Sequence, residues 1–138
     1  HEITGLTTIG DDSGLVVEAL GGEPGIYSAR YSGEDATDED NNRKLLQKLK
    51  ESNIKNRKAR FECIIAFIEC EQPKKIYTFS GTWEGEILLK QKGSRGFGYD
   101  PLFFDPKIGK TSAELEAKQK NKISHRAKAL AKLKQHIS

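Results

Sequence analysis

The sequence predicts a single domain of the α/β class, in which a mixed β-sheet is flanked by helices. Its 138 residues suit one domain, and a chain of this length buries enough surface to form a real core. Strand-like apolar runs alternate with segments whose apolar residues recur at helical spacing. Several strands are joined by short, hairpin-like connections, which favours a mixed sheet. No repeat or linker-like tract interrupts the chain, so residues 1–138 are expected to form one domain.

The first part of the chain predicts two short strands and then a helix. Thr7–Gly10 is interpreted as the end of a buried strand and Leu15–Leu20 as a second strand, with the polar stretch Asp11–Gly14 between them. Thr37 is expected to cap a helix, because its hydroxyl can accept from the first free amides and the acids that follow suit the helix dipole. The leucines at positions 45, 46 and 49 give that helix one apolar face.

The strongest strand signal is Arg60–Glu71, where apolar side chains occupy both alternating sets of positions. We therefore expect both faces of this strand to be covered. Two further strands are expected at Lys75–Trp83 and Glu84–Gln91, joined through Gly81 and Gly85.

The last third of the chain predicts a structured loop and two helices. Residues 93–106 are rich in glycine, aromatic residues and proline, which is typical of a packed loop. Ser112 can cap a short helix, and Ser124 can cap the final one. One buried stripe is expected along the final helix, formed by Ala127, Leu130, Leu133 and Ile137.

Composition points to a cytoplasmic globular protein. Apolar residues make up 36% of the chain and charged residues 31%, which is ordinary for a domain with a well-charged surface. No apolar run approaches the length of a membrane span, and the first residues lack the pattern of a signal peptide. Cys63 and Cys70 lie seven residues apart in one strand, so they point to opposite faces and are expected to be reduced thiols.

Charge is distributed unevenly along the chain. Residues 1–40 hold ten acids and one base, whereas residues 107–138 hold nine bases and two acids. A compact domain with an acidic end and a basic end suits a ligand that needs both signs, such as metal-bound phosphates. The alternative is two solvated surfaces of opposite charge. A nucleic-acid-binding module is disfavoured, because the acidic third would repel the phosphate backbone.

Asp11-Asp12-Ser13-Gly14 is the first segment that can carry chemistry. Two adjacent carboxylates cannot both point the same way, so one can hold Mg²⁺ or act as a base while the other faces elsewhere. The Ser13 hydroxyl and the amides beside Gly14 can hold a phosphate. The alternative interpretation is a simple turn, for which these residue types are equally suited.

Gly96-Phe97-Gly98-Tyr99-Asp100-Pro101 is more specific. Its glycines let the backbone approach a ligand closely. The ring of Phe97 or Tyr99 can stack on a base, while Asp100 and the loop amides can read the edge of that base by hydrogen bonds. The alternative is a packed loop with aromatic anchors.

The segment from Lys120 to Arg126 lies at the predicted start of the last helix. Free amides at a helix start attract an anion, and Lys120 and Arg126 add full positive charges. His125 is expected to stay neutral there and to hydrogen-bond a ligand. The alternative is a capped, solvated helix start.

Together these segments resemble the inosine triphosphate pyrophosphatase family, the non-canonical purine nucleoside triphosphate pyrophosphatases. The resemblance covers almost the whole chain, and its motifs occur in the family's order. It implies an elongated mixed sheet flanked by helices, with the nucleotide in a long central cleft. The matching stretches are Asp11–Leu15, Leu20–Gly22, Pro24–Tyr31, Phe97–Pro101 and Ile123–Arg126.

The resemblance also implies an activity and a set of site residues. The activity is hydrolysis of ITP, dITP and XTP to the monophosphate and pyrophosphate, which cleans the nucleotide pool. Asp12 matches the proton acceptor that helps to bind Mg²⁺, and Ser13 matches a substrate contact. The family is usually homodimeric. Further implied substrate contacts are Phe97, Gly98, Tyr99, Asp100, Lys120, His125 and Arg126.

The chain departs from the family at its N-terminal end. The family's first strand, its first helices and its Thr/Ser-x-Asn-x-x-Lys phosphate motif have no counterpart in these 138 residues. We therefore expect a domain that lacks the N-terminal part of the family fold. Two functions stay open: an active pyrophosphatase, or a catalytically inactive remnant that still binds nucleotide and dimerises.

Overall fold

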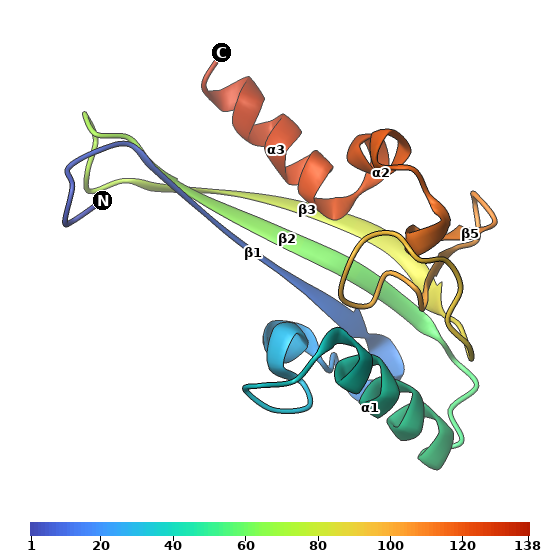
Figure 1. Cartoon of the computed structure of the whole chain (residues 1–138). Coiled ribbons are helices and arrows are strands. Elements are labelled where there is room, and N and C mark those ends of the chain that lie inside the picture. The colour runs from blue at the N-terminus through green and yellow to red at the C-terminus, as the bar shows by residue number, and fades with distance from the viewer.

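The computed structural model describes all 138 residues and has an elongated five-stranded sheet with helices packed along it, as expected for the α/β class (Figure 1). The strands follow the order β1-β2-β3-β4-β5, and every pair is antiparallel, whereas a mixed sheet was expected. They are β1 (Thr8–Val17), β2 (Lys58–Ile68), β3 (Ile76–Ile87), β4 (Phe103–Asp105) and β5 (Lys110–Thr111). The helices are α1 (Asp38–Glu51), α2 (Ala117–Ile123) and α3 (His125–His136), with 3-10 turns at Glu18–Leu20, Gly25–Arg30 and Ser112–Glu114.

Strand β1 is continuous, which corrects the expectation of two short strands separated by a turn. Its ladder with β2 runs without a break from the pair Thr8–Ile68 to the pair Val17–Ala59. The long apolar strand β2 offers a backbone partner to every residue of β1, and this pairing outweighs the turn preference of Asp11–Gly14. The acidic motif therefore lies inside a strand.

Strand β3 is also continuous, although two strands joined at glycines were expected. A Cβ atom at Gly81 would lie 2.0 Å from the carbonyl oxygen of His125, and one at Gly85 would lie 2.6 Å from that of Phe104. These glycines therefore mark places where another backbone lies against the strand, and they do not end it.

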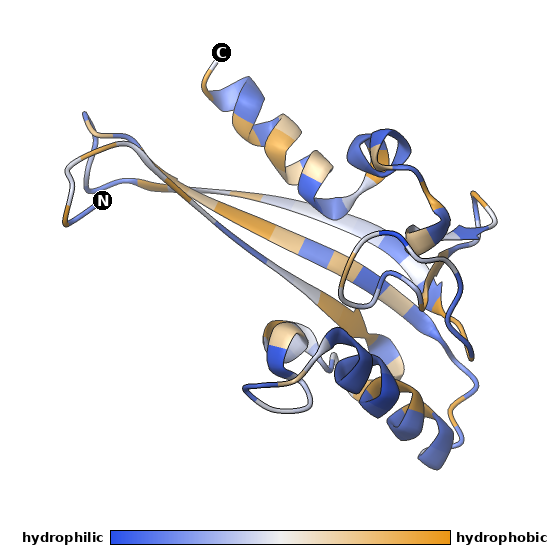
Figure 2. Ribbon diagram, viewed as in Figure 1, coloured by the Kyte–Doolittle hydropathy of each residue, from blue (hydrophilic) through white to orange (hydrophobic).

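Along β2 only one face of the sheet is covered, so the expectation of two covered faces for this strand was wrong. Burial alternates along β2, and Ile64 on the open face is 52% exposed. This alternation is typical of antiparallel sheets with a single core face, and bands of alternating hydropathy run along the strands in Figure 2. The main core contains Leu15, Val17, Tyr31, Leu45, Leu49, Ala59, Phe61, Trp83, Ile87, Tyr99, Leu102, Phe103 and Leu115. A second cluster beneath α3 contains Cys63, Ile65, Phe67, Ala129 and Leu133.

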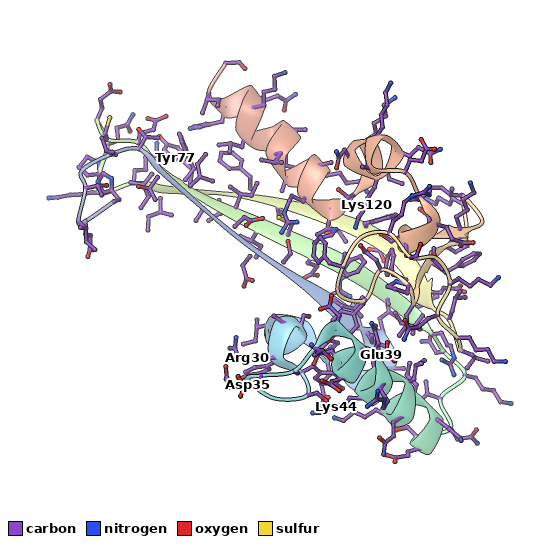
Figure 3. All side chains as sticks on the ribbon, viewed as in Figure 1. Arg30, Asp35, Glu39, Lys44, Tyr77 and Lys120 are labelled. Carbon is purple, nitrogen blue, oxygen red and sulfur yellow. The ribbon has the colours of Figure 1, made fainter.

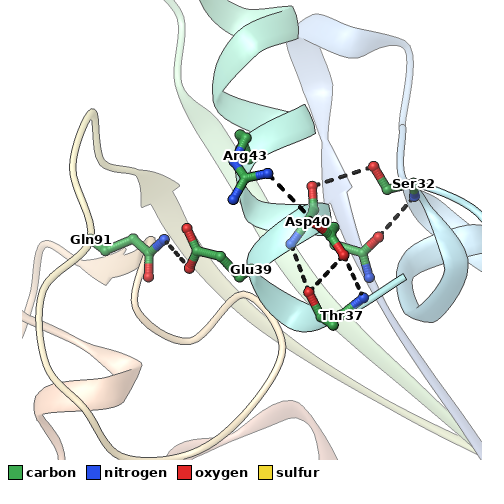
Figure 4. Close-up of polar contacts among 7 residues, drawn as sticks. Ser32, Thr37, Glu39, Asp40, Arg43 and Gln91 are labelled. Carbon is green, nitrogen blue, oxygen red and sulfur yellow. Dashed lines mark hydrogen bonds and ion pairs between the residues drawn. The ribbon is translucent and has the colours of Figure 1, made fainter. Parts of the chain in front are cut away.

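Helix α1 begins where the sequence predicts. The hydroxyl of Thr37 accepts a hydrogen bond from the Asp40 amide at 3.2 Å, and the Asp40 carboxylate accepts from the Thr37 amide at 3.0 Å (Figure 4). Two otherwise unpaired donors are satisfied in this reciprocal way. Leu45 and Leu49 form the buried side of the helix, as expected.

Helix α3 begins at the predicted cap but buries a different stripe. Ser124 accepts from the Ala127 amide at 3.2 Å. Of the expected stripe only Leu133 is buried, whereas Leu130 and Ile137 are 47% and 57% exposed. The first turn of α3 lies directly on Gly81, and this contact turns a different face of the helix toward the sheet. The buried residues of α3 are His125, Ala129 and Leu133.

Neither cysteine forms a disulfide, in line with the sequence: Cys63 is buried and Cys70 is exposed. None of the helices combines the length and the apolar character needed to cross a membrane.

Candidate active site

A pocket of about 650 Å³ lies between the covered face of the sheet, the loop that follows β3, and the start of α3. Its floor includes Leu15 of β1 and Phe61 of β2. The pocket is lined by residues from β1 near the start of the chain and from α2 and α3 near its end. Figure 3 labels Lys120, which lies on α2. Every predicted substrate-binding residue lines it: Ser13, Phe97, Gly98, Tyr99, Asp100, Lys120, His125 and Arg126.

Asp12 is the predicted site residue that the structure does not bring into this pocket. It lies between Asp11 and Ser13 on β1, so its side chain points to the opposite, open face of the sheet. Asp12 is exposed, and its carboxylate has no hydrogen-bond or ion-pair partner in the chain. Asp11, in contrast, accepts from Nε of Arg126 at 2.6 Å. Asp12 is therefore the free carboxylate of the pair.

Asp12 fits a hard cation through its oxygen atoms, but it offers one ligand. No group of three or more His, Cys, Asp or Glu side chains converges anywhere in the chain. Mg²⁺ commonly binds through one or two carboxylates and completes its shell with water and substrate phosphates. The residues present fit this kind of site, in which phosphate oxygens supply most of the ligands.

Asp100 holds the glycine-rich loop together from inside. One carboxylate oxygen accepts from the hydroxyl of Ser112 at 2.8 Å, and the other accepts from the amide of Phe97 at 3.0 Å. Nζ of Lys120 forms an ion pair with the same second oxygen. Asp100 is 3% exposed, so its charge is stabilised by these three donors. Its carboxylate thus organises the loop, and its direct contact with a base remains a prediction.

Helix α1 forms two hydrogen bonds with Gly98 of the glycine-rich loop, and the sequence did not predict this contact. The Gly98 amide donates to the Asp38 carboxylate at 2.7 Å, and the Gly98 carbonyl accepts from the Asn42 side chain at 2.9 Å. Gln91 also donates to Glu39 at 3.0 Å (Figure 4). Because Asp38 and Asn42 lie one helical turn apart, they face the same glycine. In the sequence, Asp38 is one of several acids that already suit a helix start.

Two groups of the loop remain available to a ligand. Phe97 is 65% exposed, and Nζ of Lys120 lies 5.1 Å from the centroid of its ring. The amide of Tyr99 has no acceptor in the chain, whereas the amides of Phe97 and Gly98 are both occupied. The Tyr99 hydroxyl donates to the carbonyl of Ser28 at 2.7 Å. Burial raises the pKa of Tyr99, so this hydroxyl stays protonated.

His125 presents a neutral imidazole to the pocket. His125 is 7% exposed, and its ring stacks on Phe61 with centroids 4.9 Å apart. Burial lowers the pKa of His125 to about 4, and the positive charges of Arg126 and Lys120 add to this effect. Its Nδ1 atom is buried without a partner. An unpaired buried acceptor is tolerated better than an unpaired donor, so we expect the proton on Nε2.

This environment predicts how His125 responds to pH. The ring should stay neutral from pH 8 down to about pH 5, because its folded pKa of about 4 lies below the ordinary 6.5. Below pH 6.5 the unfolded chain binds a proton at this histidine while the folded chain does not. The free energy of unfolding is therefore highest above pH 6.5 and falls as the pH drops toward 4. NMR titration of the ring carbon checks the prediction. A midpoint near 6.5 for His125 would contradict it.

Comparison with known proteins identifies the family to which the chain belongs. The family model described as the Ham1 family matches residues 1–136. The chain belongs to the Ham1 family. The fold agrees, because the Ham1 protein of Staphylococcus aureus superposes with a TM-score of 0.92 at 47% identity, covering 99% of this chain and 69% of that one. A dITP/XTP pyrophosphatase structure from Mycobacterium abscessus gives 0.79 at 39% identity, covering 96% and 68%.

Two relatives of known sequence are named dITP/XTP pyrophosphatase. The dITP/XTP pyrophosphatase of Geobacter sulfurreducens is 56% identical over 135 residues, which are 98% of this chain and 67% of that protein. The protein of the same name from Shigella flexneri is 52% identical over 129 residues, 94% of this chain and 66% of the relative. The chain thus spans about two thirds of the length of these relatives. The family resemblance that the motifs predicted is confirmed.

Proposed function

We propose that this Ham1 chain forms the purine-binding and catalytic part of a pyrophosphatase that hydrolyses ITP, dITP and XTP to the monophosphate and pyrophosphate. The observation that carries the proposal is the convergence of the predicted substrate-binding residues on one pocket. The names of its relatives support the substrate class. No observation favours the alternative of an inactive remnant.

The hydrogen-bonding character of the pocket supports selection of a 6-oxo purine. The available groups at the pocket are donors: the Tyr99 amide, the expected Nε2–H of neutral His125, and the guanidinium of Arg126. Donors match the 6-oxo oxygen of hypoxanthine or xanthine. They oppose the 6-amino group of adenine, and a buried donor that faces a donor discriminates strongly. The exposed ring of Phe97 supplies a surface on which the base can stack.

The proposed reaction is attack of water on the α-phosphorus with pyrophosphate as the leaving group. Asp12 lies on the edge strand β1 but faces away from the pocket, so the proposal requires the triphosphate to extend past this edge to Asp12. There its free carboxylate orients or deprotonates the water. Lys120 and Arg126 place positive charge at the mouth of the pocket and attract the triphosphate. A divalent cation such as Mg²⁺, when bound at Asp12, neutralises negative charge on the phosphates.

We also propose that the protein is a cytoplasmic homodimer. Both cysteines are free, which suits a reducing compartment. Ile64 and Ile76 are 52% and 63% exposed on the open face of the sheet. Exposed apolar side chains on one face favour association with a second copy.

Substrate preference tests the proposed function. Because the 6-amino group of ATP opposes the donors of the pocket, kcat/KM for XTP or ITP should exceed that for ATP by at least about 10²-fold. Turnover is measured on the full-length gene product. The nucleoside monophosphate and pyrophosphate are identified by chromatography. Equal rates on ATP and ITP, or release of inorganic phosphate in place of pyrophosphate, would contradict the proposal.

A further inference from the structure

The ion pair between Asp11 and Arg126 joins two segments 115 residues apart at the mouth of the pocket. Asp11 lies on β1 and Arg126 on the first turn of α3, with Nε and Oδ2 separated by 2.6 Å. Nη2 of Arg126 also lies 3.4 Å from the hydroxyl of Ser13. Because Asp11 and Ser13 are alternate residues of β1, both face α3.

This arrangement constrains a side chain that would otherwise be mobile. Arginine has several rotatable bonds, and ordering them at the moment of binding lowers affinity. Here the Nε–H donor is occupied by Asp11 and one Nη2–H is directed at Ser13, while the N–H groups of Nη1 and the second N–H of Nη2 remain for a ligand. A guanidinium held through Nε presents its planar fork in one fixed direction. Arg126 itself lines the pocket beside His125.

We propose that Asp11 is a positioning residue: it holds the guanidinium of Arg126 in the orientation that binds the nucleotide, and it does not contact the reacting atoms. The inference rests on the proposed function, since it assigns to Arg126 a nucleotide as its ligand. It also separates the two adjacent acids. Asp11 acts through Arg126 on the covered face of β1, whereas Asp12 is free on the open face.

A double-mutant cycle tests this role. The dissociation constant of ITP is measured by calorimetry in the presence of a metal chelator for the parent chain, Asp11→Asn, Arg126→Ala and the double variant. Asp11→Asn should weaken binding about tenfold, equivalent to about 1.4 kcal/mol. In the Arg126→Ala background the same change should have no further effect, because coupled residues are not additive. Additive losses, or unchanged or tighter binding by Asp11→Asn alone, would overturn the proposal.

Two further measurements keep the outcomes distinct. Glu62→Gln is the matched control, because Glu62 pairs with Nε of Arg60 at the same 2.6 Å and is equally exposed at 41%, but points to the open face of the sheet. It should leave the dissociation constant unchanged. The NMR signal of the Arg126 Nε–H should be sharp in the parent chain and lost in Asp11→Asn. If the parent chain holds Arg126 in this way yet binds no ITP, the proposed function fails; if ITP binds equally to Asp11→Asn, only the positioning role fails.

Discussion

Replacing Gly81 with alanine is expected to displace α3 and to impair both stability and nucleotide binding. The new methyl group would lie 2.0 Å from the carbonyl oxygen of His125 and 2.6 Å from the Ala129 amide, so backbone must move. Overpacking of this kind costs at least about 2 kcal/mol, which corresponds to a fall in melting temperature of about 6–10 °C. The shift also moves His125 and Arg126, so affinity for ITP should fall by about 10²-fold.

Gly10→Ala provides the control for this substitution. Gly10 lies in β1, and a Cβ atom built there meets nothing within 4 Å. That variant should keep the melting temperature and the affinity of the parent chain. If Gly81→Ala behaved like Gly10→Ala, the close seating of α3 on β3 would be wrong, and with it the placement of His125 at the pocket.

Replacing Asp12 with asparagine is expected to remove turnover while leaving the fold intact. The two side chains are nearly the same size, and Asp12 is exposed without a partner, so the melting temperature should hardly change. Loss of a general base typically lowers the rate by about 10²–10⁴-fold. Pyrophosphate release from XTP and thermal melting are measured on the same preparations.

The control for Asp12 is Glu84→Gln, which removes another exposed carboxylate from the open face of the sheet. It should retain normal turnover. Full activity of Asp12→Asn would assign the base to a different residue. Loss of activity in both variants would indicate a general effect of surface charge and would leave Asp12 without a specific role.

Local patterns in the sequence predicted two helix caps correctly and the strand limits poorly. The cap expected at Ser112 was wrong, because Thr111 caps the 3-10 turn Ser112–Glu114. Thr37 and Ser124 act through hydrogen bonds to amides three residues away, so their role is written into adjacent positions. The continuity of β1 depends on its register with β2, forty or more residues away. The same is true of Gly81, whose meaning depends on the backbone of α3. Glycine in isolation predicts a break as readily as a close approach.

The candidate site was predictable to a similar extent. Its lining residues fall in short motifs, and the motifs converge on one pocket. The adjacency of Asp11 and Asp12 correctly implies that they face opposite ways, but only the pairing of β1 with β2 decides which one meets Arg126. The hydrogen bonds of Asp38 and Asn42 with Gly98 join positions about sixty residues apart, so no local sequence pattern predicts them.

The measurement that tests the central claim most directly is an NMR titration of the ¹⁵N-labelled chain with inosine 5′-monophosphate, with adenosine 5′-monophosphate as comparator. Binding at the proposed pocket predicts that the largest shifts occur at the amides of Gly98, Tyr99 and Ala127 and at the ring of His125, and that the adenine nucleotide causes much smaller ones. Shifts centred instead on the charged depression beside residues 32–36, or equal shifts with both nucleotides, would contradict the account.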